Sequence, residues 1–333
     1  MMSEKITLAH GAGGLLSQRL VREIMVPAFD NPMLDELHDG AKLSGNLVFT
    51  TDSFVAKPIF FAGGDIGKLS VCGTVNDLAM SGAVPKFLSA GLIIEEGFDV
   101  VELRKLVWSM AVAADEAGVK IVTGDTKVVG HGQCDGIFIN TAGIGEALEG
   151  VNISVKNVRP KMKVLINGSI GDHATVIIAG RHGLTLPDTI KSDCAPLNGL
   201  VKAMLEVEPK IAMLRDPTRG GLAAVLNEIA QGADVGIMLD EKKLPIKPAV
   251  KGVCNLLGFD VLELANEGKV VAIVPSESAD AVLETMRQHK LGKESKIIGE
   301  VVEDPRGKVG LRTTIGSTRI VDMPTGVIVP RIC

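Results

Sequence analysis

The spacing of hydrophobic and polar positions in the first half of the chain predicts both helices and strands. Residues 66–81 form an apolar helical segment, and residues 100–117 repeat apolar side chains about every 3.6 residues, which is typical of an amphipathic helix. Gly118 is placed to end that second helix. Short apolar runs predict strands at 48–55, 87–94, 120–123 and 137–145. This mixture predicts an α/β (α+β) domain over residues 1–150.

The second half shows the same mixture after a break. Residues 146–163 lose regular spacing and gain charge, so we place a domain boundary at residue 150. A helix is predicted from residue 172, and further helices and strands are predicted at 163–166, 197–205, 221–231, 235–239 and 270–274. These elements predict a second α/β domain over residues 151–321.

The final segment, residues 322–333, has a different character. Pro324, Gly326 and Pro330 block a helix and restrict regular strand pairing. The segment is therefore predicted to be an extended, mobile tail that ends in Cys333. Fully extended, it would span about 35–40 Å.

Composition supports a soluble protein with two cores. The 333 residues exceed the roughly 250–300 at which a single core stops growing, and 46% of them are hydrophobic against 23% charged. A net charge of −5 without a long basic run argues against nucleic-acid binding. Because the start of the chain lacks a signal-like pattern and no window reaches the roughly 18 apolar residues of a membrane span, a cytoplasmic location without membrane contact is expected.

The five cysteines are odd in number and widely separated, which argues against a disulfide framework and against a zinc site. Cys72, Cys134, Cys194 and Cys254 are expected to be small buried apolar side chains. Cys333 differs because its thiol lies beside the chain's own carboxylate. That negative charge is expected to raise the thiol pKa, with Arg331 partly offsetting it, so the thiol needs a base to react.

Two glycine-rich segments fail the usual phosphate-binding patterns. Residues 62–69 approach a P-loop but carry Ala62 and Leu69 where that motif needs Gly and Ser or Thr. Residues 10–14, His-Gly-Ala-Gly-Gly, lack the spacing of a dinucleotide fingerprint. They form either a flexible connection or a mobile loop that covers a nucleotide.

Aspartates in turn-like settings give a more specific signal. They are Asp39, Asp52, Asp77, Asp125 and Asp216. Carboxylate oxygens bridge Mg²⁺ to nucleotide phosphates, so a converging set would suit a triphosphate site. Taken singly, each aspartate is more often a cap or a turn residue. Asn76 and Asp77 are harder to explain in that way, since they interrupt an apolar helix where an unpaired carboxylate is costly.

Two charged residues near these motifs are candidates for proton transfer. Lys127 follows Asp125 by two positions and would neutralise phosphate charge or, if desolvated, move a proton; a solvated lysine is an equal alternative. Glu267 precedes an apolar strand and would act as a general base with a raised pKa, although its spacing alone favours a turn residue.

These motifs together resemble the HypE family of hydrogenase maturation proteins. The matching segments are residues 10–14, 73–80, 124–127, 216–221, 266–269 and the Pro-Arg-Ile-Cys ending at 330–333. The resemblance spans essentially the whole chain, and the ending is more specific than the aspartate loops. Those loops also resemble the wider PurM-like superfamily, which includes selenophosphate synthetase and thiamine-monophosphate kinase.

The resemblance implies a PurM-like two-domain fold and an ATP-dependent carbamoyl dehydratase. A carbamoyltransferase, HypF, would load a carbamoyl group on the Cys333 thiol, and this enzyme would convert the thiocarboxamide to a thiocyanate. The cyano group would then pass to iron on a HypC–HypD complex, for [NiFe]-hydrogenase. An amide oxygen is a poor leaving group until ATP phosphorylates it, so the order of steps is chemically coherent.

The resemblance also implies roles for single residues. Four aspartates would bind Mg²⁺: Asp39, Asp77, Asp125 and Asp216. The ATP would further involve Asp52, Asn76, Gly11 and Gly13. Cys333 would be the carbamoyl acceptor, with Lys127 and Glu267 handling protons beside it. A homodimer built through the first-domain sheets, closed into a barrel-like core, is implied as well.

Two other functions stay open on the sequence. Another PurM-like synthetase or small-molecule kinase would use the aspartates but leave Cys333 idle, although selenophosphate synthetase is disfavoured because no cysteine precedes Cys72. A scaffold or passive carrier that presents a cysteine to partners would need neither the acidic loops nor ATP.

Overall fold

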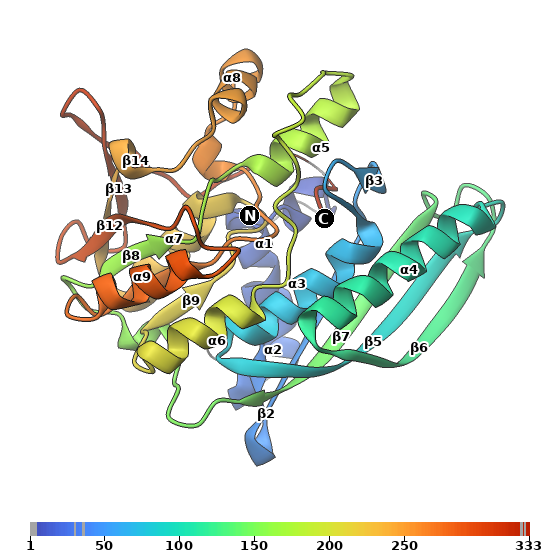
Figure 1. Ribbon diagram of the computed structural model, residues 1–333, viewed down its shortest axis with the longest axis horizontal. Helices are drawn as coiled ribbons and strands as arrows, with labels where there is room; N and C mark the ends of the chain where they lie inside the picture. The colour runs from blue at the N-terminus through green and yellow to red at the C-terminus, as the bar shows by residue number, and fades with distance from the viewer. Residues whose placement is uncertain (1–4, 30, 35–36, 327–328, 330) are drawn as a thin grey trace.

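The computed structural model describes residues 5–29, 31–34, 37–326, 329 and 331–333. Its architecture is mixed α/β, as predicted, with two large sheets, a small two-stranded one and flanking helices (Figure 1). The strands of one large sheet lie between residues 41 and 147, and those of the other lie between 163 and 321. Pro330, on which the tail prediction partly rests, lies outside the described residues. Among the described helices, none is both long and apolar enough to cross a membrane.

The first sheet has the strand order β1-β2-β7-β5-β6, with β5 and β6 parallel and the other neighbours antiparallel. Its strands are β1 Ala41–Lys42, β2 Leu47–Phe54, β5 Ala83–Glu95, β6 Lys120–Val129 and β7 Ile137–Ala147. Buried and exposed positions alternate along β7, so one face packs inward and this chain leaves much of the other face uncovered. Within one chain the described strands form an open sheet, and closure into a barrel with a second copy stays a prediction.

The predicted strand at 120–123 is too short. β6 continues in parallel register with β5 as far as Val129, and Asp125 lies opposite Gly91. The prediction that Asp125 and Lys127 lie in a turn is therefore wrong, because pairing with β5 keeps the backbone extended through both. Asp52 likewise lies inside β2, opposite Thr141 of β7.

Helices α3 (Ile66–Met80) and α4 (Val100–Ala117) lie together beside the first sheet (Figure 1). α4 has its predicted bounds and ends at Gly118, whose left-handed φ of 70° suits glycine. Asp65 caps the N-terminus of α3: its carboxylate accepts a hydrogen bond from the Lys68 backbone N–H at 3.0 Å. The rest of α3 is buried nearly all round, because its C-terminal end also joins the core of the second half.

The second sheet has the strand order β14-β13-β10-β12-β8-β11-β9. Its strands are β8 Lys163–Ile166, β9 Met213–Arg215, β10 Gly236–Asp240, β11 Val271–Val274, β12 Lys296–Val302, β13 Val309–Arg312 and β14 Thr318–Val321. Three helices share one core with it: α6 Asn198–Val207, α7 Gly221–Ala233 and α9 Ala279–Gln288. The predicted helices and strands of this half are thus present, with bounds shifted by a few residues.

A second core joins the two halves. It contains side chains of α3 and α4 together with those of α5 (Asp172–His182) and α8 (Pro248–Leu257). The start of the chain, including α1 (Leu15–Leu20), also reaches the second half, where the Gln18 amide donates to Glu228 of α7 at 3.0 Å. Further short elements include α2 Val26–Phe29, β3 Phe60–Phe61 and β4 Gly64–Asp65.

The end of the chain is docked in this structure. Figure 1 places it between α5 and β3. Ile332 and Cys333 are only 4% and 6% exposed and belong to the core that joins the two halves. The tail is therefore a packed segment at residues 331–333, and its movement away from the body stays a prediction.

Candidate active site

Three aspartates from distant parts of the chain meet at the end of α3. Asp39 precedes β1, Asp77 lies in the last turn of α3, and Asp216 follows β9. One carboxylate oxygen of each lies within 4.8 Å of the others. The structure thus brings together three of the four aspartates that were predicted to bind metal.

The electrostatics of this cluster favour a bound cation. Burial raises the pKa of Asp39 to about 6, against the opposing charge of Arg215. Burial and the charge of Asp39 raise the pKa of Asp216 to about 7. Burial and the two neighbouring carboxylates raise the pKa of Asp77 well above its usual range. A cation would relieve this mutual repulsion and restore the charged form of all three groups.

The contacts around the cluster leave one carboxylate oxygen free. The Arg215 guanidinium lies 2.9 Å from Asp39 and 3.0 Å from Glu228. The Thr50 hydroxyl lies 2.7 Å from the Asp39 carbonyl oxygen and 3.0 Å from Asp77 Oδ2. Asp39 Oδ2, in contrast, is buried without a hydrogen-bond partner. An unpartnered oxygen on one member of a three-carboxylate cluster fits a hard divalent ion such as Mg²⁺.

Asp125 and Lys127 lie elsewhere. Their side chains are 68% and 67% exposed on the edge strand β6, where Lys127 Nζ lies 2.6 Å from Asp125 Oδ2. Neither residue lines the cavity that contains Cys333. Within one chain, the fourth predicted metal ligand and the predicted proton-handling lysine are therefore separate from the aspartate cluster.

The predicted glycine loop lies against the loop that follows Asp216. Gly13 has a left-handed φ of 74°, and a Cβ added there would lie 2.5 Å from the Cβ of Arg219. The same addition at Gly11 would meet nothing within 4 Å. Gly13 is thus required for close packing on Arg219, while Gly11 faces open space at the cavity wall.

A cavity of about 620 Å³ lies beside these groups. This volume falls in the range of about 300–1,000 Å³ that small-molecule sites occupy. Its walls include Gly11, Ser53, Arg219, Ile332 and Cys333. The terminal cysteine predicted to carry the substrate is therefore a wall of a cavity large enough for a ligand.

The thiol of Cys333 lies in the electrostatic field of the buried Glu267 carboxyl and the exposed Arg219 guanidinium. Burial and the charge of Glu267 raise the thiol pKa, and the Arg219 guanidinium opposes them. Glu267 is 3% exposed, and its Oε1 has no hydrogen-bond partner. Burial and the charges of Asp216 and Asp193 raise the pKa of Glu267 well above its usual range. The thiol pKa is raised, as predicted, but by burial and Glu267 rather than by the chain's own carboxylate, and the offsetting charge is Arg219 rather than Arg331.

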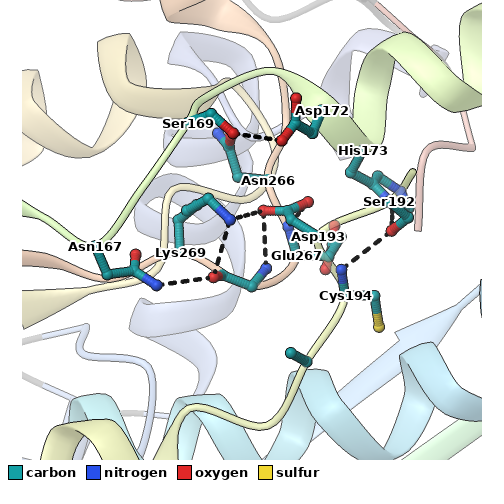
Figure 2. A network of polar contacts seen from close by, with 12 residues as sticks. Asn167, Ser169, Asp172, His173, Ser192, Asp193, Cys194, Asn266, Glu267 and Lys269 are labelled. Carbon is teal, nitrogen blue, oxygen red and sulfur yellow. Dashed lines mark hydrogen bonds and ion pairs between the residues drawn. The ribbon is translucent and has the colours of Figure 1, made fainter. Parts of the chain in front are cut away.

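The backbone around Glu267 is held by a buried ion pair. Figure 2 shows Asp193, Lys269 and Glu267 gathered together, with His173 and Ser192 to one side. Asp193 accepts hydrogen bonds from the N–H groups of Glu267 and Gly268, each at 3.2 Å, and lies 3.0 Å from Lys269 Nζ. Although burial opposes it, the Lys269 charge holds the pKa of Asp193 below its usual range.

Asn76 fixes the same loops from the side of α3. Its Nδ2 donates to the carbonyl oxygens of Ala195 and Glu267, at 3.2 and 3.5 Å, and its Oδ1 accepts from the Leu197 N–H at 2.7 Å. The amide within the apolar helix is therefore satisfied by backbone groups. This geometry makes Asn76 a residue that positions Glu267, and nucleotide contact by Asn76 stays a prediction.

Sequence reasoning missed three polar residues at this site: Arg219, Asp193 and His173. Arg219 lies inside the matched motif at 216–221, so that motif was a usable signal. Asp193 and His173 belong to no motif, and their contacts with the Glu267 loop and with the docked tail arise only in the folded structure. All five cysteines are free and buried, as was expected for the four internal ones.

Known proteins resemble this chain over nearly its whole length. The family of AIR synthase related proteins matches through its N-terminal domain at residues 38–147 and its C-terminal domain at residues 159–312. Carbamoyl dehydratase HypE of Cupriavidus necator is 49% identical over 335 residues, which cover 99% of this chain and 95% of that protein.

Solved structures agree with this likeness. The crystal structure of a HypE–HypF complex contains a chain that is 53% identical, with a TM-score of 0.88, and the match covers 92% of this chain and 99% of that one. A hydrogenase maturation protein HypE in complex with ATP is 46% identical, with a TM-score of 0.84 and coverage of 99% and 100%. The predicted PurM-like fold is therefore confirmed.

Proposed function

Because the chain belongs to the HypE family of carbamoyl dehydratases, which act in hydrogenase maturation, we propose that it uses ATP to dehydrate a carbamoyl group carried on Cys333. The observation that supports this most is the docked tail. It buries the Cys333 thiol in the electrostatic field of Glu267 and Arg219, at a cavity beside the aspartate cluster. A passive carrier would have no need for that environment.

The proposed chemistry converts a thiocarboxamide to a thiocyanate. The carbamoyl oxygen attacks the γ-phosphorus of ATP, ADP leaves, and the nitrogen loses one proton. The C–O bond then breaks, phosphate leaves with the oxygen, and loss of the second proton leaves S–C≡N. Positioning the oxygen in line with the phosphorus supplies most of the acceleration in such transfers.

Glu267 is the proposed acceptor of one of these protons. Its raised pKa makes its carboxylate a stronger base than an ordinary one, and its Oε1 has no competing donor. Asp193, Lys269 and Asn76 hold its backbone in place. Arg219 is positioned to balance negative charge that develops near the sulfur and the oxygen.

Asp39, Asp77 and Asp216 would hold Mg²⁺, which neutralises phosphate charge when it is bound. Gly11 lines the cavity that contains Cys333, and Gly13 follows it two residues later, so both remain candidates for covering the nucleotide. Burial raises the pKa of Asp52 and the Arg219 charge opposes this shift, so Asp52 remains a candidate for nucleotide binding. The solved HypE structure with ATP supports the choice of nucleotide.

The buried position of Cys333 determines how partner proteins can reach it. Docked Cys333 is only 6% exposed, so a second protein cannot reach its thiol. Loading by the HypF carbamoyltransferase therefore requires the tail to leave this docked position. The solved HypE–HypF complex supports HypF as this partner. The cyano group is then proposed to pass to iron on HypC–HypD.

A homodimer is proposed through the uncovered face of the first sheet. Phe49, Ile144 and Phe87 are cross-strand neighbours, and their side chains are 40%, 41% and 48% exposed. Such an apolar row on a sheet face is typical of an interface. Lys127, opposite Ile93 on the same sheet, and Asp125 would then lie at this interface, where they would serve the partner's site.

Intact and tail-peptide mass spectrometry tests the reaction. The protein is carbamoylated on Cys333 by HypF and then incubated with Mg-ATP. We expect the tail peptide to lose the mass of one water only when ATP is present. An unchanged adduct, with ATP instead phosphorylating another small substrate, would favour the alternative PurM-like synthetase or kinase.

A further inference from the structure

The last three residues dock through backbone hydrogen bonds against the segment that follows β2. The N–H of Val55 donates to the carbonyl oxygen of Cys333 at 2.9 Å, and the N–H of Lys57 donates to that of Arg331 at 3.2 Å. The two pairs run in opposite directions along the chain, as in an antiparallel ladder. Residues 331–333 therefore lie antiparallel to residues 55–57, although a left-handed φ of 52° at Arg331 keeps them from forming a regular strand.

Side chains of the protein body form hydrogen bonds with the other side of this segment. The carbonyl of Ile332 points away from the segment at 55–57 and accepts from His173 Nε2, at 2.9 Å. Arg181 contributes two hydrogen bonds of 2.7 Å, from its Nε to the Lys57 carbonyl and from its guanidinium to the Arg331 carbonyl. All three tail carbonyls are thus satisfied by groups of the protein body.

The side chains of the tail also make specific contacts with the protein body. Arg331 forms an ion pair with Asp135, donates from Nε to the Val55 carbonyl at 2.8 Å, and lies over the Phe138 ring at 5.6 Å. Ile332 is buried in the core that joins the two halves. Arginine, isoleucine and the terminal cysteine therefore each meet a matching environment.

We propose that these groups form a peptide-binding slot that recognises a C-terminal Arg-Ile-Cys sequence as a separable ligand, whether or not it is part of the same chain. Backbone hydrogen bonds to residues 55–57 supply affinity. The contact of Asp135 with Arg331 and the apolar surroundings of Ile332 supply specificity, as in peptide recognition along an extended segment. Resting on the proposed function, this makes the tail a substrate: an S-carbamoylated peptide ending in this sequence is dehydrated in trans.

Fluorescence anisotropy tests the slot without any chemistry. The probe is a fluorescein-labelled peptide of residues 325–333, and the protein is a variant that ends at residue 330. We expect saturable binding to this variant and at least tenfold weaker binding to the full chain. The full chain's own tail occupies the slot at an effective concentration of about millimolar, which a free peptide cannot match.

A charge exchange tests the specificity. A peptide with Arg331→Glu is expected to bind at least tenfold more weakly, because it faces Asp135 with a like charge. The variant Asp135→Lys is expected to recover binding of that altered peptide and to lose binding of the natural one. If the shortened chain does not fold, the full-length Arg331→Glu protein, whose own tail lacks the ion pair, takes its place.

The outcomes separate the slot from the reaction. No binding to either protein, or equal binding of the natural and Arg331→Glu peptides, would overturn the slot. The same peptide, S-carbamoylated, is then given Mg-ATP and the protein that binds it. Loss of one water from the peptide establishes dehydration in trans, whereas a peptide that binds but keeps its mass leaves the slot intact and overturns dehydration in trans. Failure of the protein's own carbamoylated tail to lose water would instead contradict the proposed function.

Discussion

The imidazole Nε2 of His173 lies 2.9 Å from the carbonyl oxygen of Ile332, the residue before the terminal cysteine. Because a carbonyl only accepts, Nε2 carries the proton, and Nδ1 accepts from the Ser192 hydroxyl at 2.8 Å. The Ser192 oxygen accepts in turn from the Cys194 N–H at 3.1 Å. One neutral imidazole thus joins the docked tail to the loop that carries Asp193.

This arrangement predicts a pH dependence of stability. Burial lowers the pKa of His173 from 6.5, against the charge of Asp193, and Arg181 lowers it further. The folded pKa lies below the unfolded one, so the unfolded chain binds more protons as the pH falls through about 6.5, and stability is lost there. Because the raised pKa values of Asp39 and Asp216, about 6 and about 7, act in the opposite direction, the loss should appear in a difference: the free energy of unfolding in urea of the wild type minus that of His173→Gln is expected to fall between pH 7.5 and pH 5.5.

The variant His173→Gln identifies the source of that loss. Glutamine keeps a donor for the Ile332 carbonyl but does not titrate, so the free energy of unfolding of the variant is expected to fall less, or rise more, than that of the wild type over this pH range. An unchanged slope in the variant would assign the acid sensitivity to other groups.

The two glycines of the 10–14 loop give a matched pair. Gly13→Ala would place a Cβ 2.5 Å from Arg219 in a left-handed conformation, whereas Gly11→Ala meets nothing within 4 Å. We expect Gly13→Ala to cost about 1–3 kcal/mol and to lower the melting temperature by several degrees. Gly11→Ala should leave it within about one degree, as measured by differential scanning fluorimetry. Equal melting temperatures would contradict the close packing on Arg219.

The aspartate cluster predicts a trade between stability and function. Asp77→Asn removes one of three mutually repelling buried carboxylates, so the protein without metal is expected to melt a few degrees higher. The stabilisation that Mg-ATP adds should largely disappear, and dehydration should fall at least about 100-fold. Asp39→Asn is the control, because it also breaks the ion pair with Arg215 and should not stabilise the protein. Full activity of Asp77→Asn would contradict a metal role.

Local features of the sequence determined most of the helices and strands. α4 has its predicted bounds because its apolar period and Gly118 are both local signals. The predicted strand at 120–123 was too short because the continuation of β6 depends on pairing with β5. Propensity within a short window carries no information on such a partner.

The site was predictable in its residue types and less so in its grouping. Asp39, Asp77 and Asp216 meet only after both sheets have formed, so spacing alone does not separate them from Asp125. The docked position of the tail depends on His173, Arg181 and Asp135, whose contacts arise from tertiary structure. The exposed Asp125 and Lys127 pair becomes interpretable only with a second copy.

Glu267 is predicted to act in the dehydration but not in loading. Glu267→Gln keeps the size and the backbone contacts of the residue, so HypF should still carbamoylate Cys333. We expect the ATP-dependent step to slow about 100- to 1,000-fold, within the range for loss of a general base. In the unaltered protein, the acidic limb of the pH–rate profile should lie well above the ordinary range of a glutamate, because burial raises the pKa of Glu267. A Gln variant with an unchanged rate and profile would remove Glu267 from the proton transfer.

Lys127 is predicted to act on the cysteine of the partner subunit, and mixed dimers test this. Protein with Lys127→Ala is expected to be inactive, and protein with Cys333→Ser lacks the acceptor. In a mixed dimer, the Cys333 of the first chain faces the intact Lys127 of the second, so co-expression of the two should restore about a quarter of the wild-type dehydration. If Lys127 serves its own chain, the mixture stays inactive, because neither chain has both residues. Sedimentation analysis of the same samples checks the dimer itself, and a monomer with full activity would contradict the shared site.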